Sequence, residues 1–271
     1  MTESKTPYWK TSVSDITPED VFVRGYPIKE LIGKLPYSAV VHLLIRGKMP
    51  TKGQSQVIDS ILCSILDYGL QKSGTVAARY VVSVNPQMIA GLASAVLAAG
   101  EYSMSPESAG VFIQENFAAW KESGKDMRVF ADELVGQLRK ERKRIPGFGH
   151  PVFRNFDPRA QKLKTIAIEN SVWGDVGKFY EAVHDAFKAT VNKPDLVIND
   201  IGMIACILSE MGYSPQETAG LAILSTIPGV IAHVSEELAS NVKIRAVQDS
   251  DAQYDRSRRD LVAEMKKAGW A

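Results

Sequence analysis

The sequence contains few of the residues that build disulfide frameworks or metal sites. Its 271 residues include two cysteines, Cys63 and Cys206, and four histidines. The cysteines lie far apart, each within an apolar run, so we expect two buried, reduced thiols and no disulfide. The histidines and cysteines show no metal-ligand spacing, so we also expect no bound metal.

The sequence also lacks an excess of one charge and an uninterrupted apolar run of membrane-spanning length. Its 32 basic and 31 acidic side chains give a net charge of +1, which offers no reason to expect a nucleic-acid partner. Every long apolar stretch contains a charge or a proline, and the polar N-terminus has no signal-peptide core. We therefore expect a cytoplasmic protein with neither a membrane nor a nucleic-acid partner.

Helical periodicity, by contrast, runs through nearly the whole sequence. Apolar side chains in residues 58–66 follow the i, i+3, i+4 spacing of a helix with one buried face. A capping box at residues 214–217, with proline at the first helical position, predicts the start of a long apolar helix. Residues 17–20 predict another helix start. Alternating strand patterns are scarce, with residues 79–84 the best candidate, so the sequence predicts an all-α fold.

One segment, residues 144–160 (RIPGFGHPVFRNFDPRA), combines glycines, a histidine and several cations. Gly147 and Gly149 flank Phe148 and permit backbone conformations closed to other residues, or the close approach of a ligand to the main chain. His150 follows them directly. An imidazole in such a loop is suited to acid–base chemistry or to hydrogen bonding with a ligand.

The cations of this segment lie near a predicted helix start. Asp157 is expected to cap a helix that opens at Pro158, which places Arg159 in the first turn. Arg144 and Arg154 add positive charge where a helix N-terminus already favours anions. The pattern indicates a carboxylate or phosphate ligand beside the histidine. A glycine-rich turn with surface arginines is the plainer structural alternative.

The same segment closely resembles the GFGH-x-V-(Y/F)-(K/R)-N-(Y/F)-DPRA signature of citrate synthases and citryl-CoA lyases. Residues 24–28 (RGYPI) and 41–51 (VHLLIRGKMPT) resemble the N-terminal portion of that family, and residues 228–233 (PGVIAH) resemble one of its later helices. On these motifs the chain is identified as a small, lyase-type member of the citrate synthase and citryl-CoA lyase superfamily.

This resemblance implies an architecture and an assembly. We expect a citrate synthase-like fold of two helical domains, a large one from residues 1–104 and 201–271 and a small one from residues 105–200. The family is dimeric, with sites between domains that close over the ligand. We therefore expect a homodimer, or a hetero-oligomer with a homologue.

The resemblance also implies roles for individual residues. His150 corresponds to the histidine that donates to the reacting carbonyl, and Arg159 to the arginine that binds a substrate carboxylate. Arg154, Arg144 and the loop of Gly147, Phe148 and Gly149 are expected to bind coenzyme A. Arg245, in a basic stretch near the C-terminus, is expected to bind phosphate or carboxylate across a dimer interface. His42, His184 and His233 are interpreted as packing or structural residues.

Three positions depart from the family pattern. Ser103 stands where we place an enolising histidine, and it can donate a hydrogen bond to a thioester oxygen but cannot carry positive charge. Ile201 stands at the catalytic aspartate position. Asp200, one residue earlier, is either a helix N-cap or a carboxylate that a local backbone change returns to the site. Thr226 replaces a second carboxylate-binding arginine, so recognition of one carboxylate is lost.

Two functional hypotheses remain open from the sequence. The first is an acyl-CoA-dependent carbon–carbon lyase or synthase of the aldol or Claisen type. It would use a coenzyme A thioester as substrate, His150, Asp200 and Ser103 as catalytic residues, and a substrate with fewer carboxylates than citrate. The second is a non-catalytic CoA-binding chain, or a partner subunit of an active homologue.

Overall fold

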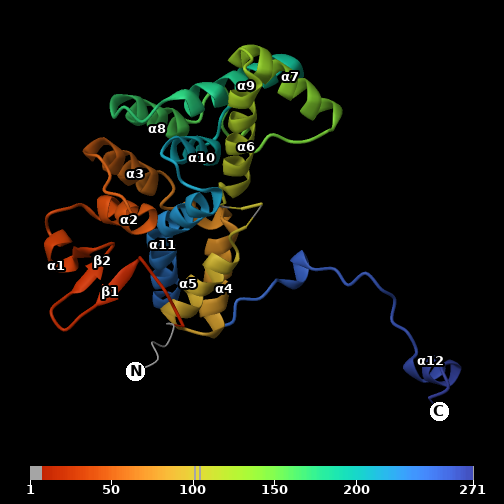
Figure 1. Cartoon of the computed structure of the whole chain (residues 1–271). Coiled ribbons are helices and arrows are strands. Elements are labelled where there is room, and N and C mark those ends of the chain that lie inside the picture. Colours follow the sequence, from red (N-terminus) through yellow and green to blue (C-terminus); the bar gives the residue numbers. More distant parts are fainter. Residues whose placement is uncertain (1–7, 101, 104, 271) are drawn as a thin grey trace, which may run out of the picture.

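The computed structural model describes residues 8–100, 102–103 and 105–270 and confirms the all-α prediction (Figure 1). A small antiparallel sheet of three short strands precedes the helices. The elements in chain order are β1 (Ser14–Ile16), β2 (Val21–Val23), β3 (Tyr26–Pro27), α1 (Ile28–Leu31), α2 (Tyr37–Arg46), α3 (Lys52–Ser64), η1 (Gly69–Gln71), α4 (Ser73–Val84), α5 (Met88–Leu97), α6 (Glu107–Ser123), α7 (Met127–Lys140), α8 (Pro158–Glu169), α9 (Asp175–Val191), α10 (Asp200–Glu210), α11 (Pro215–Ala239), η2 (Asp249–Asp251) and α12 (Leu261–Lys267).

Helix α11 is the central helix of the fold. It begins at the predicted capping box, where Ser214 Oγ accepts from the Glu217 amide at 3.1 Å and the Glu217 carboxylate accepts from the Ser214 amide at 2.7 Å. Among the described helices it alone is long and apolar enough to cross a membrane. In this structure it packs against α3, α4, α5, α6 and α10.

Two local predictions were wrong. Residues 79–84 form the end of α4 and not a strand, because Ala78 and Val82 lie one turn apart and both pack into the core shared with α5 and α11. Residues 17–20 form the turn between β1 and β2. Thr17 Oγ1 accepts from the Glu19 and Asp20 amides there, as a helix cap would, but it closes a turn.

The two cysteines differ in burial. Cys206 is fully buried in α10, as expected, but Cys63 is exposed on α3, so that part of the prediction was wrong. The neighbouring Ile61 and Ile65 lie on the buried side of α3. The apolar residues around Cys63 therefore do not all lie on the buried face of α3, and Cys63 itself lies on the exposed side.

Helix α8 packs against both α3 and α10, and residues of all three helices share one hydrophobic core. The predicted boundary between a large and a small domain stays a prediction. Helix α8, which falls in the predicted small domain, packs on α3 as well as on α10. Figure 1 shows α12 standing apart, at the end of an extended C-terminal segment.

Candidate active site

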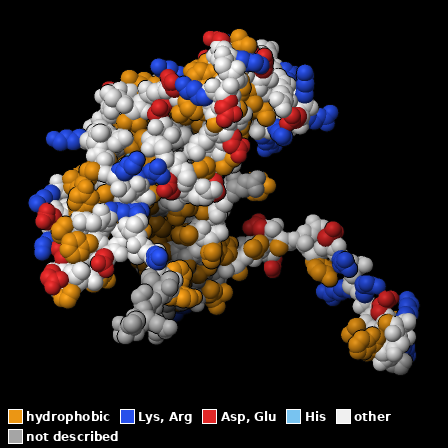
Figure 2. Space-filling view, viewed as in Figure 1, with side chains coloured by type: hydrophobic (Ala, Val, Ile, Leu, Met, Phe, Trp, Pro, Cys, Tyr) orange, Lys and Arg blue, Asp and Glu red, His pale blue; other side chains and the backbone are white. Residues whose placement is uncertain are grey.

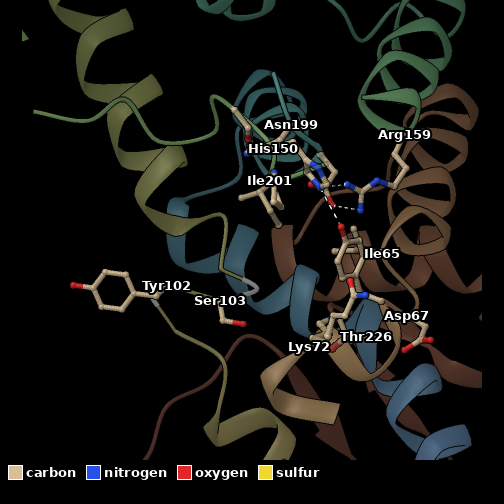
Figure 3. A pocket seen from close by; sticks show the side chains of 15 residues that line it. Ile65, Asp67, Lys72, Tyr102, Ser103, His150, Arg159, Asn199, Ile201 and Thr226 are labelled. Atoms are coloured by element: carbon tan, nitrogen blue, oxygen red, sulfur yellow. Dashed lines mark hydrogen bonds and ion pairs between the residues drawn. The ribbon is translucent and has the colours of Figure 1, made fainter. Parts of the chain in front are cut away.

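Most of the predicted site residues meet around one cavity of about 330 Å³. Six parts of the chain line it: the turn after α3, the start of α4, the bridge at Ser103, the loop after α7, and the starts of α8 and α10. Thr226 of α11 completes the wall. Of the predicted residues, Ser103, Gly149, His150, Arg159, Asp200 and Thr226 line the cavity (Figure 3).

The glycine-rich loop is held against the N-terminus of α10. Gly147 has φ +85°, and a Cβ there would lie 2.6 Å from the Gly202 Cα, so only glycine fits. The Asn199 amide donates to the Gly147 carbonyl at 3.0 Å, and its side chain donates to the Gly149 carbonyl at 2.8 Å. Phe148 packs among aromatic rings of α9. These glycines thus serve packing, and the CoA-binding role of this loop stays a prediction.

The hydrogen bonds of His150 define its tautomer. Its Nδ1 accepts from the Val152 and Phe153 amides, both at 3.1 Å. Backbone amides only donate, so Nδ1 carries no proton and the neutral ring carries its hydrogen on Nε2. Nε2 lies 3.2 Å from the Tyr68 hydroxyl and 3.3 Å from Arg159 Nη2 at the cavity wall. His150 therefore presents a donor toward the cavity.

Arg159 is fixed by two carboxylates. Asp157, the predicted N-cap of α8, accepts from the Arg159 amide at 2.9 Å and from Nη2 and Nε of its guanidinium at 2.8 and 3.2 Å. Nη1 pairs with Asp200 at 2.7 Å. Burial opposes the charge, but the Asp157 hydrogen bonds and the two carboxylate charges raise the pKa of the guanidinium. The arginine predicted to bind substrate is already bonded on three nitrogens.

Asp200 lies in the site although its spacing departs from the family pattern. The N-cap of α10 is Asn199, whose side chain accepts from the Gly202 amide at 2.9 Å, so the interpretation of Asp200 as the cap was wrong. Asp200 is the first helical residue, 8% exposed, and borders the cavity. Burial raises its pKa, Arg159 lowers it and Asp157 raises it, and the net shift is upward. Such a carboxylate is suited to accept a proton.

Ser103 and Thr226 also depart from the family pattern, and the hydroxyl of each has a hydrogen-bond partner within the chain. Ser103 Oγ lies 3.1 Å from Ser73 Oγ at the start of α4. Thr226 is 3% exposed, and its hydroxyl donates to the Ile223 carbonyl of its own helix at 2.9 Å. Neither residue brings charge to the cavity. Ile201, at the family's aspartate position, adds an apolar contact there.

Three predicted cations do not line the cavity. Arg245 bonds the buried Glu237 carboxylate at 2.6 and 2.9 Å. Arg154 donates to the His150 and Phe153 carbonyls at 2.6 and 2.9 Å, so it fixes the backbone of the loop. Arg144 is exposed. Their binding of coenzyme A or substrate stays a prediction. Within the described part of the chain, no group of three metal-binding side chains is close enough to hold an ion.

The cavity residues that the sequence reasoning missed include the polar side chains of Asp67, Tyr68 and Lys72. Asp67 accepts from His233 at 3.1 Å and from the Gly69 amide at 3.1 Å. Burial lowers the pKa of Lys72, although Asp67 and Asp200 oppose the shift. Lys72 is the N-cap residue of α4, where the helix dipole disfavours a cation, and that misfit was a readable signal.

His42 and His184 lie in packing positions, whereas His233 bonds the cavity residue Asp67. His42 Nδ1 lies 2.7 Å from the Tyr213 hydroxyl in the core. His184 accompanies Phe148 and bonds the Leu196 carbonyl at 3.0 Å, and burial lowers its pKa to about 4.

The comparisons with known proteins agree with this arrangement. The family model described as "Citrate synthase, C-terminal domain" matches residues 52–247, which is more than half of the chain. The chain belongs to the citrate synthase superfamily. The predicted family is therefore confirmed. Enzymes of this family use coenzyme A thioesters and make or break carbon–carbon bonds.

Several relatives within the citrate synthase superfamily are similar over most of this chain. The structure of citryl-CoA lyase from Hydrogenobacter thermophilus is 32% identical, with a TM-score of 0.87, and the match covers 96% of this chain and 100% of that one. ATP citrate lyase from Methanothrix soehngenii, solved with citrate and coenzyme A, is 22% identical with a TM-score of 0.79, over 94% of this chain and 42% of that one, and shows the fold alone.

Among curated relatives, a probable ATP-citrate synthase of Caenorhabditis elegans is 26% identical over 84% of this chain. The match covers 22% of that relative, so this chain spans about a fifth of its length. The activity of the remaining part of that relative is not assigned to this chain.

Proposed function

We propose that this protein is an acyl-CoA-dependent carbon–carbon lyase or synthase of the aldol or Claisen type, resembling citryl-CoA lyase, whose substrate carries fewer carboxylates than citrate. One observation carries the proposal. The donor side of His150, the Arg159 guanidinium and the Asp200 carboxylate meet at one cavity, while the hydroxyl of Thr226 is bonded to its own helix.

In the synthetic direction, Asp200 takes the proton from the carbon next to the thioester. The enolate that forms attacks the carbonyl carbon of the acceptor, and a new carbon–carbon bond results. His150 lies on the oxygen side, where negative charge develops, and its Nε2–H supports the hydrogen bonding there. In the cleavage direction the same bond breaks, its electron pair passes into the thioester as an enolate, and protonated Asp200 returns the proton to carbon.

The charges of the cavity support a weakly charged acceptor. Its two cations, Lys72 and Arg159, are matched in number by the carboxylates of Asp67 and Asp200. Arg159 is engaged with Asp157 and Asp200, and Thr226 offers no charge-assisted bond. A substrate with three carboxylates would leave charge unbalanced, so we propose an acceptor with one carboxylate or none, such as an apolar or aromatic aldehyde or ketone.

The test is turnover by the purified chain. Acetyl-CoA is offered with oxaloacetate, with a 2-oxo monocarboxylate, or with an aromatic aldehyde, and formation of the CoA thioester adduct is followed by mass spectrometry for each pair. We expect turnover with the less charged acceptors and its loss in His150→Gln, with Tyr37→Phe on α2, an exposed residue outside the cavity, as the unaffected control. Brisk citrate formation from oxaloacetate would overturn the proposed substrate class.

A second candidate function, a non-catalytic CoA-binding or partner subunit, is favoured by one observation. Asp157 and Asp200 already accept from three of the five N–H groups of the Arg159 guanidinium, which leaves fewer donors for a substrate. This candidate predicts that the pure chain binds acetyl-CoA in calorimetry and turns over no thioester. Turnover that depends on His150 excludes it.

We also propose that the chain pairs with a second copy through the outer face of α4 and α5. Hydrophobic side chains gather around these helices in Figure 2. Large exposed residues on them are Tyr80, Val84, Ile89, Val96 and Leu97. Apolar patches of this kind mark protein interfaces. Light scattering after gel filtration is expected to give twice the chain mass of 29.7 kDa, and Ile89→Asp is expected to give the chain mass itself.

A further inference from the structure

We propose that Tyr68 is a catalytic residue, whose phenol exchanges the proton with the substrate oxygen while His150 acts through it. The inference rests on the proposed function and assigns a role to a residue that the family resemblance did not supply. Tyr68 follows α3 in the turn before η1, and its ring lines the cavity beside Arg159 and His150.

The direction of the hydrogen bond between Tyr68 and His150 follows from the tautomer. A neutral imidazole carries one N–H, and Nδ1 is occupied by two backbone donors, so that hydrogen lies on Nε2. Across the 3.2 Å contact, His150 Nε2–H donates and the Tyr68 hydroxyl oxygen accepts. The hydrogen of the phenol is then free of His150 and can point into the cavity.

Arg159 cannot take the place of Tyr68 as the partner of His150. Its Nη2 lies 3.3 Å from Nε2, but both atoms carry hydrogen, so the contact joins two donors and is no hydrogen bond. The phenol oxygen is thus the acceptor that the imidazole has within the described cavity wall. In this relay His150 Nε2–H donates to Tyr68 Oη, and Tyr68 Oη–H in turn donates to an oxygen of the ligand.

The surroundings of Tyr68 stabilise the phenolate that proton transfer leaves behind. The Arg159 guanidinium lies over the Tyr68 ring, 5.4 Å from its centroid, and its cation attracts a negative ring and oxygen. His150 Nε2–H points at the same oxygen. Asp157 holds the guanidinium in this position through two bonds. One cation and one N–H donor therefore converge on the oxygen that would lose a proton.

The step balances with the residues present. In synthesis, the enolate carbon bonds the acceptor carbonyl carbon, the carbonyl electron pair moves to oxygen, and that oxygen takes the Tyr68 proton. The phenolate is reprotonated from water, and Asp200 releases to water the proton that it took from carbon. In cleavage, the phenolate takes the substrate hydroxyl proton as the carbon–carbon bond breaks. His150 stays neutral in both directions.

The first experiment is kinetic and uses the full chain with the acceptor that wild type turns over best. Tyr68→Phe is expected to lower kcat by about a hundredfold to ten-thousandfold and to change KM by less than about threefold, because the lost proton transfer matters mainly in the transition state. Since His150 acts through Tyr68, the double variant with His150→Gln is expected to be no slower than the worse single variant. Tyr37→Phe, at an exposed tyrosine outside the cavity, is the matched control and keeps wild-type kcat.

The second experiment reads the relay without turnover. The ¹⁵N chemical shifts of His150, measured at alkaline pH where histidine side chains are neutral, are expected to show an unprotonated Nδ1 and a protonated Nε2. A proton on Nδ1 overturns the inference, as does wild-type kcat in Tyr68→Phe while wild type is active. If wild type turns over no CoA thioester, the proposed function fails and the catalytic role of Tyr68 fails with it, which is a distinguishable result.

Discussion

The molecule holds two clusters of arginine and carboxylate side chains that use the same chemistry to different ends. In the first, the Glu237 carboxylate at the end of α11 is buried. One oxygen accepts from Arg245 at 2.6 Å, and the other accepts from Arg79 at 2.6 Å and from Arg245 at 2.9 Å. Two cations enclose one anion, and both carboxylate oxygens are bonded.

In the second cluster, two carboxylates enclose one cation. Arg159 pairs with Asp157 and Asp200, and it also borders the Tyr68 and Phe153 rings, His150 and the cavity. Asp157 and Asp200 differ in turn. Burial raises the pKa of both, but hydrogen bonds with Arg159 bring the pKa of Asp157 below its usual value, whereas that of Asp200 stays raised.

The comparison separates ion pairs that hold the fold from those that form a site. Arg245 and Arg159 were both predicted to bind substrate, and both make charge-assisted bonds. Of the two arginines, Arg159 lines the cavity of the candidate site, and its partner Asp200 carries a carboxylate whose charge the protein disfavours. A carboxylate with a raised pKa at the wall of a cavity therefore indicates the site better than the presence of an arginine does.

The largest difference between the clusters is expected when each loses an arginine. Arg159→Met leaves Asp157 and Asp200 as two partly buried carboxylates without a cation, and is expected to cost about 3 kcal/mol of unfolding free energy. Arg245→Met leaves Glu237 paired with Arg79, so the loss is expected to be clearly smaller. Urea unfolding at neutral pH measures both variants.

A variant that keeps the positive charge of Arg159 serves as the control for this comparison of stability losses. Arg159→Lys keeps the cation but loses the planar fork that bonds Asp157 at two nitrogens. Its stability is expected to lie between wild type and Arg159→Met. Equal losses for Arg159→Met and Arg245→Met would show that the two clusters are both structural.

A smaller effect, of opposite sign in the two clusters, is expected from neutralising one acid in each. The pKa of Glu237 is lowered, chiefly by its hydrogen bonds with Arg245, so its contribution to stability is present above the unfolded pKa and lost as pH falls through the folded value. Glu237→Gln is therefore expected to cost about 1–2 kcal/mol at neutral pH, and less in acid.

The raised pKa of Asp200 gives the reverse dependence. Its stabilising contribution is present below the unfolded pKa and is lost as pH rises through the folded value. Asp200→Asn is expected to be more stable than wild type at neutral pH, with a gain that shrinks in acid, and to lose turnover by about a thousandfold as a missing base would. Unfolding by urea across a pH series gives both slopes, and parallel slopes for the two variants contradict the assignment.

The local parts of this site were predictable and the long-range parts were not. Asp157 and Arg159 are two positions apart, and Asp157 followed by Pro158 already predicts a capped helix start. Asn199 and Asp200 are both good caps by type. The choice of Asn199 is supported by its bond to the Gly149 carbonyl, 50 positions away. No local pattern contains that information.

Tyr68 shows the same limit more strongly. Its partner His150 lies 82 positions further along the chain, and nothing in the turn after α3 indicates that the two side chains meet. The family resemblance directed attention to Ser103 as the enolising position, but the structure gives that hydroxyl a serine partner. Lys72 was readable in principle, because a cation at a helix N-terminus opposes the dipole. The fold was thus predictable from periodicity and motifs, and half of the site from one loop.

The smallest expected effect comes from restoring a cation at position 226 in the cavity wall. Thr226→Arg is expected to raise the preference for a dicarboxylate over a monocarboxylate acceptor, measured as the ratio of kcat/KM values, by about tenfold, which corresponds to about 1.4 kcal/mol. The gain stays below that of a full charge-assisted bond because Thr226 is buried and the new side chain must displace neighbours. Thr226→Met adds a long side chain without charge and is the matched control. An equal ratio in the two variants would mean that the cavity selects its acceptor by shape, and that the missing arginine does not set the substrate class.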